Sequence, residues 1–197
     1  LLTRIAHSSH FMGPVLRFNS MYHTTWEEDP TTWQWQRPPG YEGHATAGLG
    51  ARWVHDTRLQ LINPKQGHWY EFAYRMHPRW SNLNPAYYQW NLDLRRYQPL
   101  RNLANPKGPL DDIVWAHRVF LHSAGQGVSF REMPAIGGDN LLRGYFRGYT
   151  RGHRAWVMEN ELRGMWGKRL GWNLYWGAGQ SGNTWESVVE RLPRQSL

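Results

Sequence analysis

The chain lacks three features that would indicate its class. None of its 197 residues is cysteine, which excludes a disulfide framework and a thiolate metal site. It has no run of about twenty apolar residues, so a transmembrane helix is excluded. The opening residues, LLTRIAHSSHFMG, hold no apolar segment of the kind a secretory signal peptide needs. We therefore expect that a signal was removed or that the chain begins inside a longer protein.

Acidic residues are also scarce. Lys and Arg number 23 against 15 Asp and Glu, a formal net charge of +8. This balance favours anionic partners: nucleic acid, lipid A phosphates or acidic lipid head groups. The mean hydropathy of −0.73 is typical of a soluble protein, but membrane barrels reach similar values because their lumen-facing residues are polar.

Signals of catalysis are missing as well. The ten histidines are scattered and form no HExxH or i, i+4 pair. His55 and Asp56 are adjacent, so a strand would point them to opposite faces, and Ser123 lies in no nucleophile-elbow pattern. Glu159 and Glu161 share a strand face, where we interpret them as structural partners for arginine. We expect no enzymatic activity, no metal site and no cofactor.

Aromatic residues, in contrast, are abundant, with 13 Trp and 10 Tyr. Such rings are enriched where one end lies in oil and the other in water, as in the girdles of a membrane barrel, although simple compositional bias would give the same count.

The aromatic residues follow a period of two. In YYQWNLDLRR, Tyr88, Trp90, Leu92 and Leu94 alternate with polar residues, which is typical of a strand with one apolar face. The same alternation predicts seven strands, near 11–23, 43–58, 67–78, 85–100, 111–123, 153–166 and 168–180. Most have ten or more residues, the length that crosses a hydrocarbon layer when tilted, whereas soluble strands cluster at five or six.

The face opposite the aromatic residues carries Arg17, Arg52, Arg75, Arg95, Arg118 and Arg163. On the lipid side of a membrane barrel each would cost about 2–4 kcal/mol near the midplane, so we place this face in a lumen. A soluble sandwich or barrel with a hydrated face is the alternative. The segment 111–123 is the least regular, with His117 among its apolar positions and Phe120 among its polar ones.

The connections alternate in length. Stretches at 24–42, at 124–152 and from 181 onward are long, whereas NPKQ and GK are compact turns. Long external loops and short turns on the other side are typical of outer-membrane barrels.

Two motifs add specificity. The stretch GLGARWVHDTRLQLINPKQGHWYEF resembles a strand–turn signature of the bacterial surface antigen superfamily, the barrels of outer-membrane assembly and two-partner secretion. The matching residues are Gly48, Gly50, Asp56, Thr57, Arg58, Asn63, Pro64, Gly67 and Glu71. GGDNLLRGY, residues 137–145, resembles the loop that marks the same superfamily, and ENELR resembles the strand that follows it. FMGPVLRFNSMYH also resembles an upstream strand.

The resemblance implies a role for the arginine of the RGY triplet. In the superfamily the long loop, here about 124–152, folds into the lumen and its arginine pairs with acids of the wall. Carried over, Arg143 would pair with Glu161, Gly144 would permit close approach, and Tyr145 would wedge the loop against the wall. Gly177 stands where many relatives have an aspartate, so this lock would have one acid fewer.

The resemblance also implies a fold and a function. The fold class is all-β: residues 1–197 would form a partial antiparallel transmembrane β-barrel of surface antigen type, about seven meandering strands of an expected sixteen. About six strands would precede Leu1 and about three would follow Leu197, without a POTRA-like domain. We therefore expect a fragment or an incomplete product of a longer barrel.

Three functions remain open at this point. The first is an outer-membrane barrel that inserts or translocates polypeptides by offering strand edges to them. Its partners would be outer-membrane lipids, lipopolysaccharide, client polypeptides and accessory lipoproteins, and not nucleic acid. The second is a passive outer-membrane anchor or pore for a fused domain. The third is a soluble, basic, aromatic-rich β module that binds nucleic acid or glycans.

Overall fold

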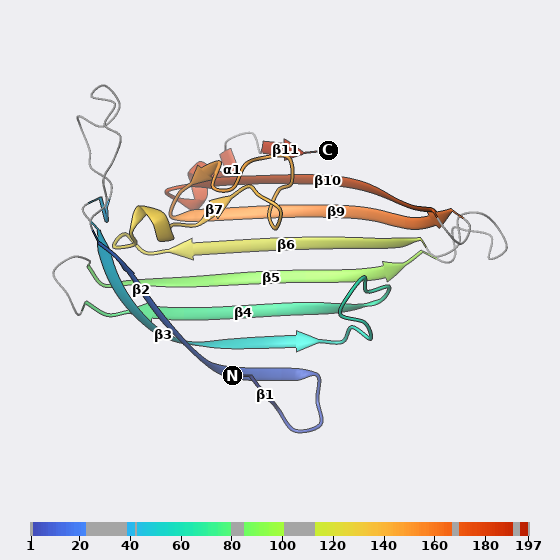
Figure 1. Ribbon diagram of the computed structural model, residues 1–197, viewed down its shortest axis with the longest axis horizontal. Helices are drawn as coiled ribbons and strands as arrows, with labels where there is room; N and C mark the ends of the chain where they lie inside the picture. Colours follow the sequence, from blue (N-terminus) through green and yellow to red (C-terminus); the bar gives the residue numbers. More distant parts are fainter. Residues whose placement is uncertain are drawn as a thin grey trace.

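The body of the protein is one curved antiparallel sheet (Figure 1). The computed structural model describes residues 2–22, 39–41, 43–79, 85–100, 113–166, 170–190 and 194–196. In this part the nine strands lie in the order β1-β2-β3-β4-β5-β6-β9-β10-β11. The long strands are β2 (His10–Met21), β3 (His44–Asp56), β4 (Gly67–His77), β5 (Tyr87–Pro99), β6 (Val114–Ala124), β9 (Arg154–Trp166) and β10 (Leu170–Gly182). The short edge strands are β1 (Thr3–Arg4) and β11 (Arg194–Ser196).

The seven strands predicted from alternation are confirmed, each with bounds within three residues of those expected. They have 11 to 13 residues, long enough to cross a hydrocarbon layer when tilted. Most of the long stretch 24–42 and the GK turn lie outside the described residues. None of the helices among the described residues has the length and apolar character needed to span a membrane.

Strand register sorts the side chains onto two faces. Tyr74 lies opposite Trp90, and Arg95 opposite Arg118, and opposite residues of an antiparallel pair share a face. The aromatic and aliphatic side chains therefore gather on one face and the charged ones on the other, as predicted. The apolar face is largely uncovered: Leu16 is 80% exposed and Phe18 66%. We call it the outer face and the charged one the inner face.

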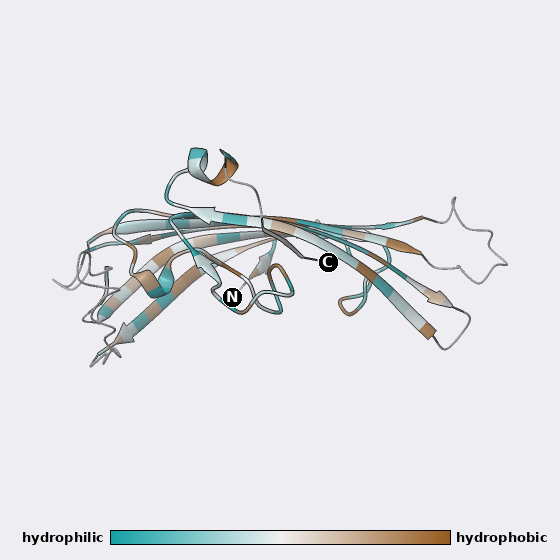
Figure 2. Ribbon diagram, turned by 90° about the horizontal axis from the view of Figure 1, so that it is seen from above, coloured by the Kyte–Doolittle hydropathy of each residue, from teal (hydrophilic) through white to brown (hydrophobic). Residues whose placement is uncertain are grey.

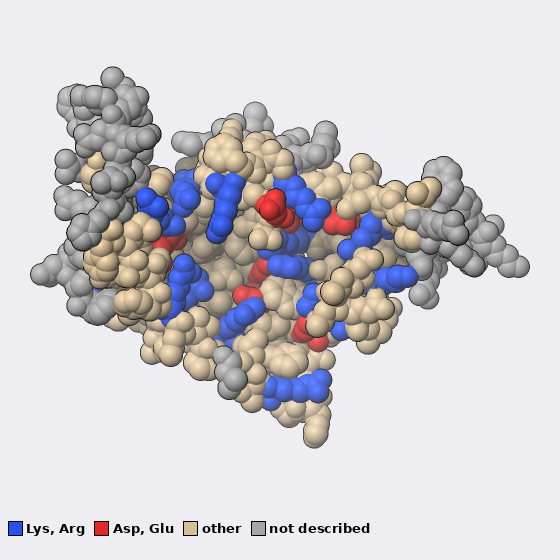
Figure 3. All heavy atoms as spheres, in the orientation of Figure 1, with Lys and Arg blue, Asp and Glu red and all other residues tan. Residues whose placement is uncertain are grey.

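The sheet is bent into an arch (Figure 2). The inner face is concave, and looking into it shows basic side chains with acidic ones among them (Figure 3). A long connection between β6 and β9, residues 125–153, lies on this concave side. We call it the in-folded loop; it holds η2 (Phe130–Glu132) and a small hairpin of β7 (Ala135–Ile136) and β8 (Thr150–Arg151). In the described part of the chain, the sheet's two edges are not joined to each other.

A small apolar core fixes the in-folded loop to the inner face. Ile136 and Leu142 of the loop are fully buried against Ala155 and Val157 of β9, and Phe120 of β6 packs on the same cluster. This explains the irregular segment 111–123: Phe120 occupies a polar position because the loop, not water, covers it. Burying such side chains contributes about 1.5–3 kcal/mol each.

A short helix covers part of the outer face. In α1 (Trp185–Glu190), the Trp185 ring lies 6.0 Å from that of Trp90, and the Trp156 indole donates a hydrogen bond to the Val188 carbonyl at 3.5 Å. Val188 is fully buried in this contact.

Candidate functional site: the inner wall and the in-folded loop

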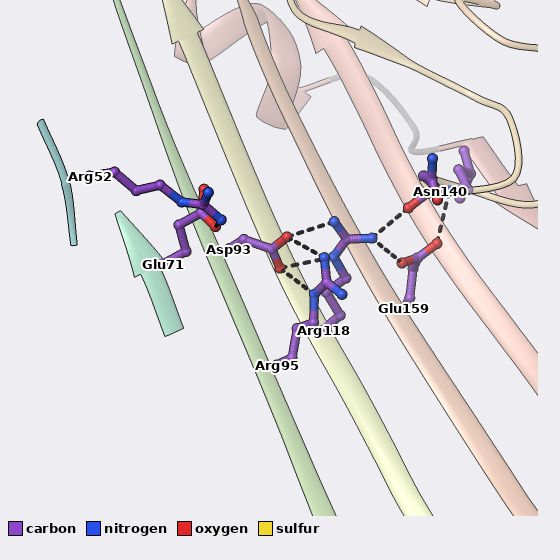
Figure 4. A network of polar contacts seen from close by, with 8 residues as sticks. Arg52, Glu71, Asp93, Arg95, Arg118, Asn140 and Glu159 are labelled. Carbon is purple, nitrogen blue, oxygen red and sulfur yellow. Dashed lines mark hydrogen bonds and ion pairs between the residues drawn. The ribbon is translucent and has the colours of Figure 1, made fainter. Parts of the chain in front are cut away.

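The middle of the inner face is organised around one buried carboxylate, Asp93 of β5 (Figure 4). Arg118 of β6 donates to it from Nε at 2.9 Å and Nη2 at 2.7 Å, and Arg95 donates from Nε at 3.1 Å and Nη2 at 2.9 Å. Both arginines bind the Asp93 carboxylate in a bidentate manner, which makes these hydrogen bonds strong and directional. Glu71 and Arg52 form a neighbouring ion pair between β4 and β3. Arg52, Arg95 and Arg118 are thus held in place by two acids of the wall.

The same Arg118 connects the wall to the in-folded loop. Its Nη1 donates to the Asn140 carbonyl of the loop and lies 3.3 Å from Oε2 of Glu159 on β9. Oε1 of Glu159 accepts the backbone N–H of Leu142 at 2.9 Å and the Tyr175 hydroxyl at 2.8 Å. Leu142 has a φ of 56°, a left-handed conformation that is rare for a leucine. One carboxylate therefore anchors both the loop backbone and a wall arginine.

A second anchor runs from the loop to the wall. Glu132, in η2, is buried and accepts hydrogen bonds from Tyr87 at 2.5 Å, Asn19 at 3.0 Å and Thr46 at 3.1 Å. Arg17 Nε lies 3.5 Å from the same carboxylate. These donors come from β5, β2 and β3, so the loop is tied to the opposite side of the arch from the first anchor.

The electrostatics of Glu132 follow from these contacts. Burial by itself raises the pKa of its carboxyl group, but the donors, with Tyr87 and Asn19 foremost, and the charge of Arg17 outweigh it. The net result is a pKa below the ordinary value for glutamate, because the hydrogen bonds favour the charged form.

Two glycines of the strand–turn motif keep the wall free for these contacts. A Cβ on Gly48 would lie 2.5 Å from the His77 ring, which stacks on Tyr87 with centroids 4.3 Å apart. A Cβ on Gly50 would lie 1.9 Å from the carbonyl oxygen of Tyr74. Only residues without a side chain fit β3 at these two positions.

The rest of the motif forms the turn between β3 and β4. Arg58 donates to Asp56 from Nε at 2.9 Å and Nη2 at 2.8 Å, which closes the turn on itself. Gly67 has a φ of 97°, and a Cβ there would lie 2.7 Å from the Thr57 carbonyl.

This turn also reaches across the arch. Pro64 is buried, and its carbonyl accepts a hydrogen bond from Arg163 of β9, 99 residues away in sequence. The turn residues Asp56, Arg58, Pro64 and Gly67 therefore lie at the opposite end of the inner face from the in-folded loop. Gly48 lies instead beside His77, near the end where Tyr87 binds Glu132 of the loop.

The predicted lock residues are placed differently from the expectation. Arg143 is exposed; its guanidinium lies 5.1 Å from the Tyr175 ring centroid, and its backbone N–H donates to the Tyr175 hydroxyl at 3.3 Å. Among the described residues no ion pair joins it to Glu161, which accepts from Asn173 at 2.8 Å and lies 3.9 Å from Arg163. The loop does fold onto the wall, but the carboxylate that receives it is Glu159.

The other two lock residues lie in the same loop. Gly144 has a φ of 94°, a conformation that glycine adopts without strain. Tyr145 packs against the core of Ile136, Leu142, Ala155 and Val157, and its ring lies 4.7 Å from that of Tyr149. Tyr145 therefore contacts the wall through this apolar core and not through Arg143.

Sequence reasoning missed Glu132 and assigned no loop contact to Glu159. The sequence holds one indication of a role for Glu132: with Asp139, it is one of two acidic residues in the arginine-rich stretch 124–152. Among the described residues no group of three or more acidic or histidine side chains is arranged to hold a metal ion. The chemistry of the site is that of fixed charge and hydrogen bonding.

Comparison with known proteins bears on the fold. A scan of protein families found no match, and neither did a search of curated proteins. Solved structures do match, among them the crystal structure of BamA from Haemophilus ducreyi lacking POTRA domains 1–3. The similarity covers 90% of this chain and 40% of that one, with a TM-score of 0.63 and 16% identity. The protein therefore has a BamA-like outer-membrane β-barrel fold, present as an open sheet that spans less than half the length of the BamA chain it matches.

Proposed function

We propose that the protein is part of an outer-membrane barrel that inserts or translocates other polypeptides. The observation that carries the proposal is the in-folded loop, bound to the inner wall of a BamA-like sheet through Glu159 and Glu132. The resemblance of the GGDNLLRGY and GLG motifs to the surface antigen superfamily supports it from the sequence.

The two faces of the sheet support a location in the outer membrane. Leu16, Phe18, Met76 and Leu174 on the outer face are 60–80% exposed. Contact with acyl chains would remove this apolar surface from water at about 25 cal/mol per Å². A soluble module would leave it wet, which argues against binding of nucleic acid or glycans by a free β module.

The mechanism we propose uses the edges of the sheet. An incoming polypeptide would pair with an open strand edge of the complete barrel, which supplies main-chain hydrogen bonds without regard to sequence. The anchored loop would hold the wall in shape while the edge is open. Lipopolysaccharide and other outer-membrane lipids would surround the outer face, and client polypeptides and accessory lipoproteins would be the protein partners.

The test is depletion of the full-length protein in its own cell. We expect other outer-membrane barrels to decline, as measured by quantitative mass spectrometry of the outer-membrane fraction. Wild-type protein and Glu161→Gln should restore them, and Glu159→Gln should restore them less. If barrel levels stay constant after depletion, the protein is a passive anchor or pore and the proposal fails.

A further inference from the structure

A second feature of the inner face is a cavity of about 710 Å³ between the in-folded loop and the wall, next to the Glu132 anchor. This volume is in the range of small-molecule sites. Its lining includes four arginines, Arg17 from β2 and three from the loop: Arg131, Arg147 and Arg151.

Acids are fewer than arginines in the lining of the cavity. Glu132 already accepts from three hydroxyl and amide donors besides its contact with Arg17. Asp139 is exposed, and no ion pair joins it to an arginine among the described residues. Arginines therefore outnumber carboxylates in the lining of the cavity.

The loop arginines are crowded at this place. Arg151 stacks on the Phe130 ring at 5.2 Å and donates to the Arg131 carbonyl at 3.2 Å, which fixes its guanidinium. Burial first, and then repulsion from Arg131 and Arg147, lowers the pKa of Arg151. Crowded like charges of this kind are unfavourable until an anion joins them.

A wall residue gives an independent sign of a ligand. Nε2 of His122 is shielded from solvent and has no hydrogen-bond partner in the described part of the chain. His122 lines the same cavity from β6. Buried polar atoms are nearly always paired in proteins, so a polar group that enters the cavity could pair with this nitrogen.

We propose that the cavity binds a phosphate ester carried on a compact polar body such as a sugar, with the phosphate held by Arg17, Arg147 and Arg151. A phosphate ester carries about −1.5 to −2 charges at neutral pH, so the basic lining of the cavity would attract it. Its oxygens accept from several guanidinium groups at once, and a hydroxyl of the sugar would reach His122. The site goes beyond the proposed function, since no client polypeptide takes part.

The experiment is calorimetric titration of the purified chain, folded in detergent micelles, with glucose 1-phosphate. We expect saturable binding at one site, weakened by about tenfold in Arg147→Gln, which loses one charge-assisted contact. Arg143→Gln is the matched control: it is an exposed arginine of the same loop that does not line the cavity. His122→Phe should also weaken binding, whereas glucose alone should not bind.

The results separate specific binding from simple attraction between charges. Absence of saturation, or an equal loss in Arg143→Gln, would overturn the proposal. Micelles of lipid A provide a second arm: competition with glucose 1-phosphate supports the site with a lipid head group as a source of phosphate, and lack of competition supports it with a soluble phosphosugar. Neither result depends on the translocation of polypeptides.

Discussion

The sharpest prediction concerns Glu159, because one side chain holds both the loop and the wall. Glu159→Gln keeps the shape but removes the charge that receives Leu142 N–H, the Tyr175 hydroxyl and Arg118. A hydrogen bond to a charged group is worth about 1.5–3 kcal/mol. Glu159 and Arg118 are only 13% and 16% exposed, so solvent screening is limited. We expect the closed loop to lose roughly 1.5–3 kcal/mol relative to the open loop.

Limited proteolysis measures this loss. Arg143 and Arg147 are exposed in the loop, and trypsin cuts after arginine once the segment can open into its active site. When opening and closing are faster than cleavage, the rate follows the open population. Since 1.4 kcal/mol is a factor of ten, we expect cleavage at these two positions to be roughly 10 to 100 times faster in Glu159→Gln.

The matched control is Glu161→Gln, two residues along the same face of β9. Its contacts, Asn173 and Arg163, both belong to the wall, so the cleavage rate of the loop should stay near that of the wild type. Faster cleavage in Glu161→Gln with no change in Glu159→Gln would refute the reasoning and favour the pairing of Arg143 with Glu161 implied by the family resemblance.

Two further predictions concern Gly50 in the middle of β3 and Glu132 of the second anchor. Gly50→Ala should destabilise the fold by roughly 1–3 kcal/mol or more, because the added Cβ would press against the Tyr74 carbonyl. The yield of folded, heat-modifiable protein on gels should therefore fall. Gly171→Ala should fold normally, because its Cβ would meet nothing closer than 3.7 Å. Acid should release the second anchor. Because the pKa of Glu132 is lowered in the folded protein, its carboxylate stabilises the fold fully at pH values above 4.5, the ordinary pKa of glutamate. This stabilisation is lost as the pH falls through the pKa of Glu132 in the folded protein. Hydrogen exchange in residues 128–136, corrected for intrinsic rates, should therefore rise on acidification, and Glu132→Gln should abolish that dependence.

The strands and their two faces could be predicted because apolar and polar residues alternate along each strand. Tyr88 to Leu94 alternate with polar residues whatever the rest of the chain does, and the register follows from keeping one face apolar. Alternation did not explain Phe120, because this apolar side chain lies on the charged inner face. Ile136 and Leu142 of the in-folded loop cover it there.

The anchors could not be predicted in the same way. Leu142 binds Glu159 through its backbone N–H, and its backbone has a left-handed conformation that a leucine in the sequence does not predict. The bond from Asn19 to Glu132 spans 113 residues, and that from Arg163 to Pro64 spans 99. The resemblance located the loop, and the choice between Glu159 and Glu161 depended on a shift of two residues along one strand face.

The distribution of charge along the inner face ties the anchors to the cavity. In the middle of the wall each acid has arginine beside it: Asp93 has two, Glu159 shares Arg118, and Glu71 has Arg52. At the end under the loop, Glu132 already accepts three hydrogen bonds, and arginines outnumber acids in the lining of the cavity. Removing Arg118 takes one of its two arginines from Asp93 and the arginine beside Glu159, so it should destabilise the wall. Removing Arg147 relieves repulsion, so it should leave the fold intact and change only what the cavity binds.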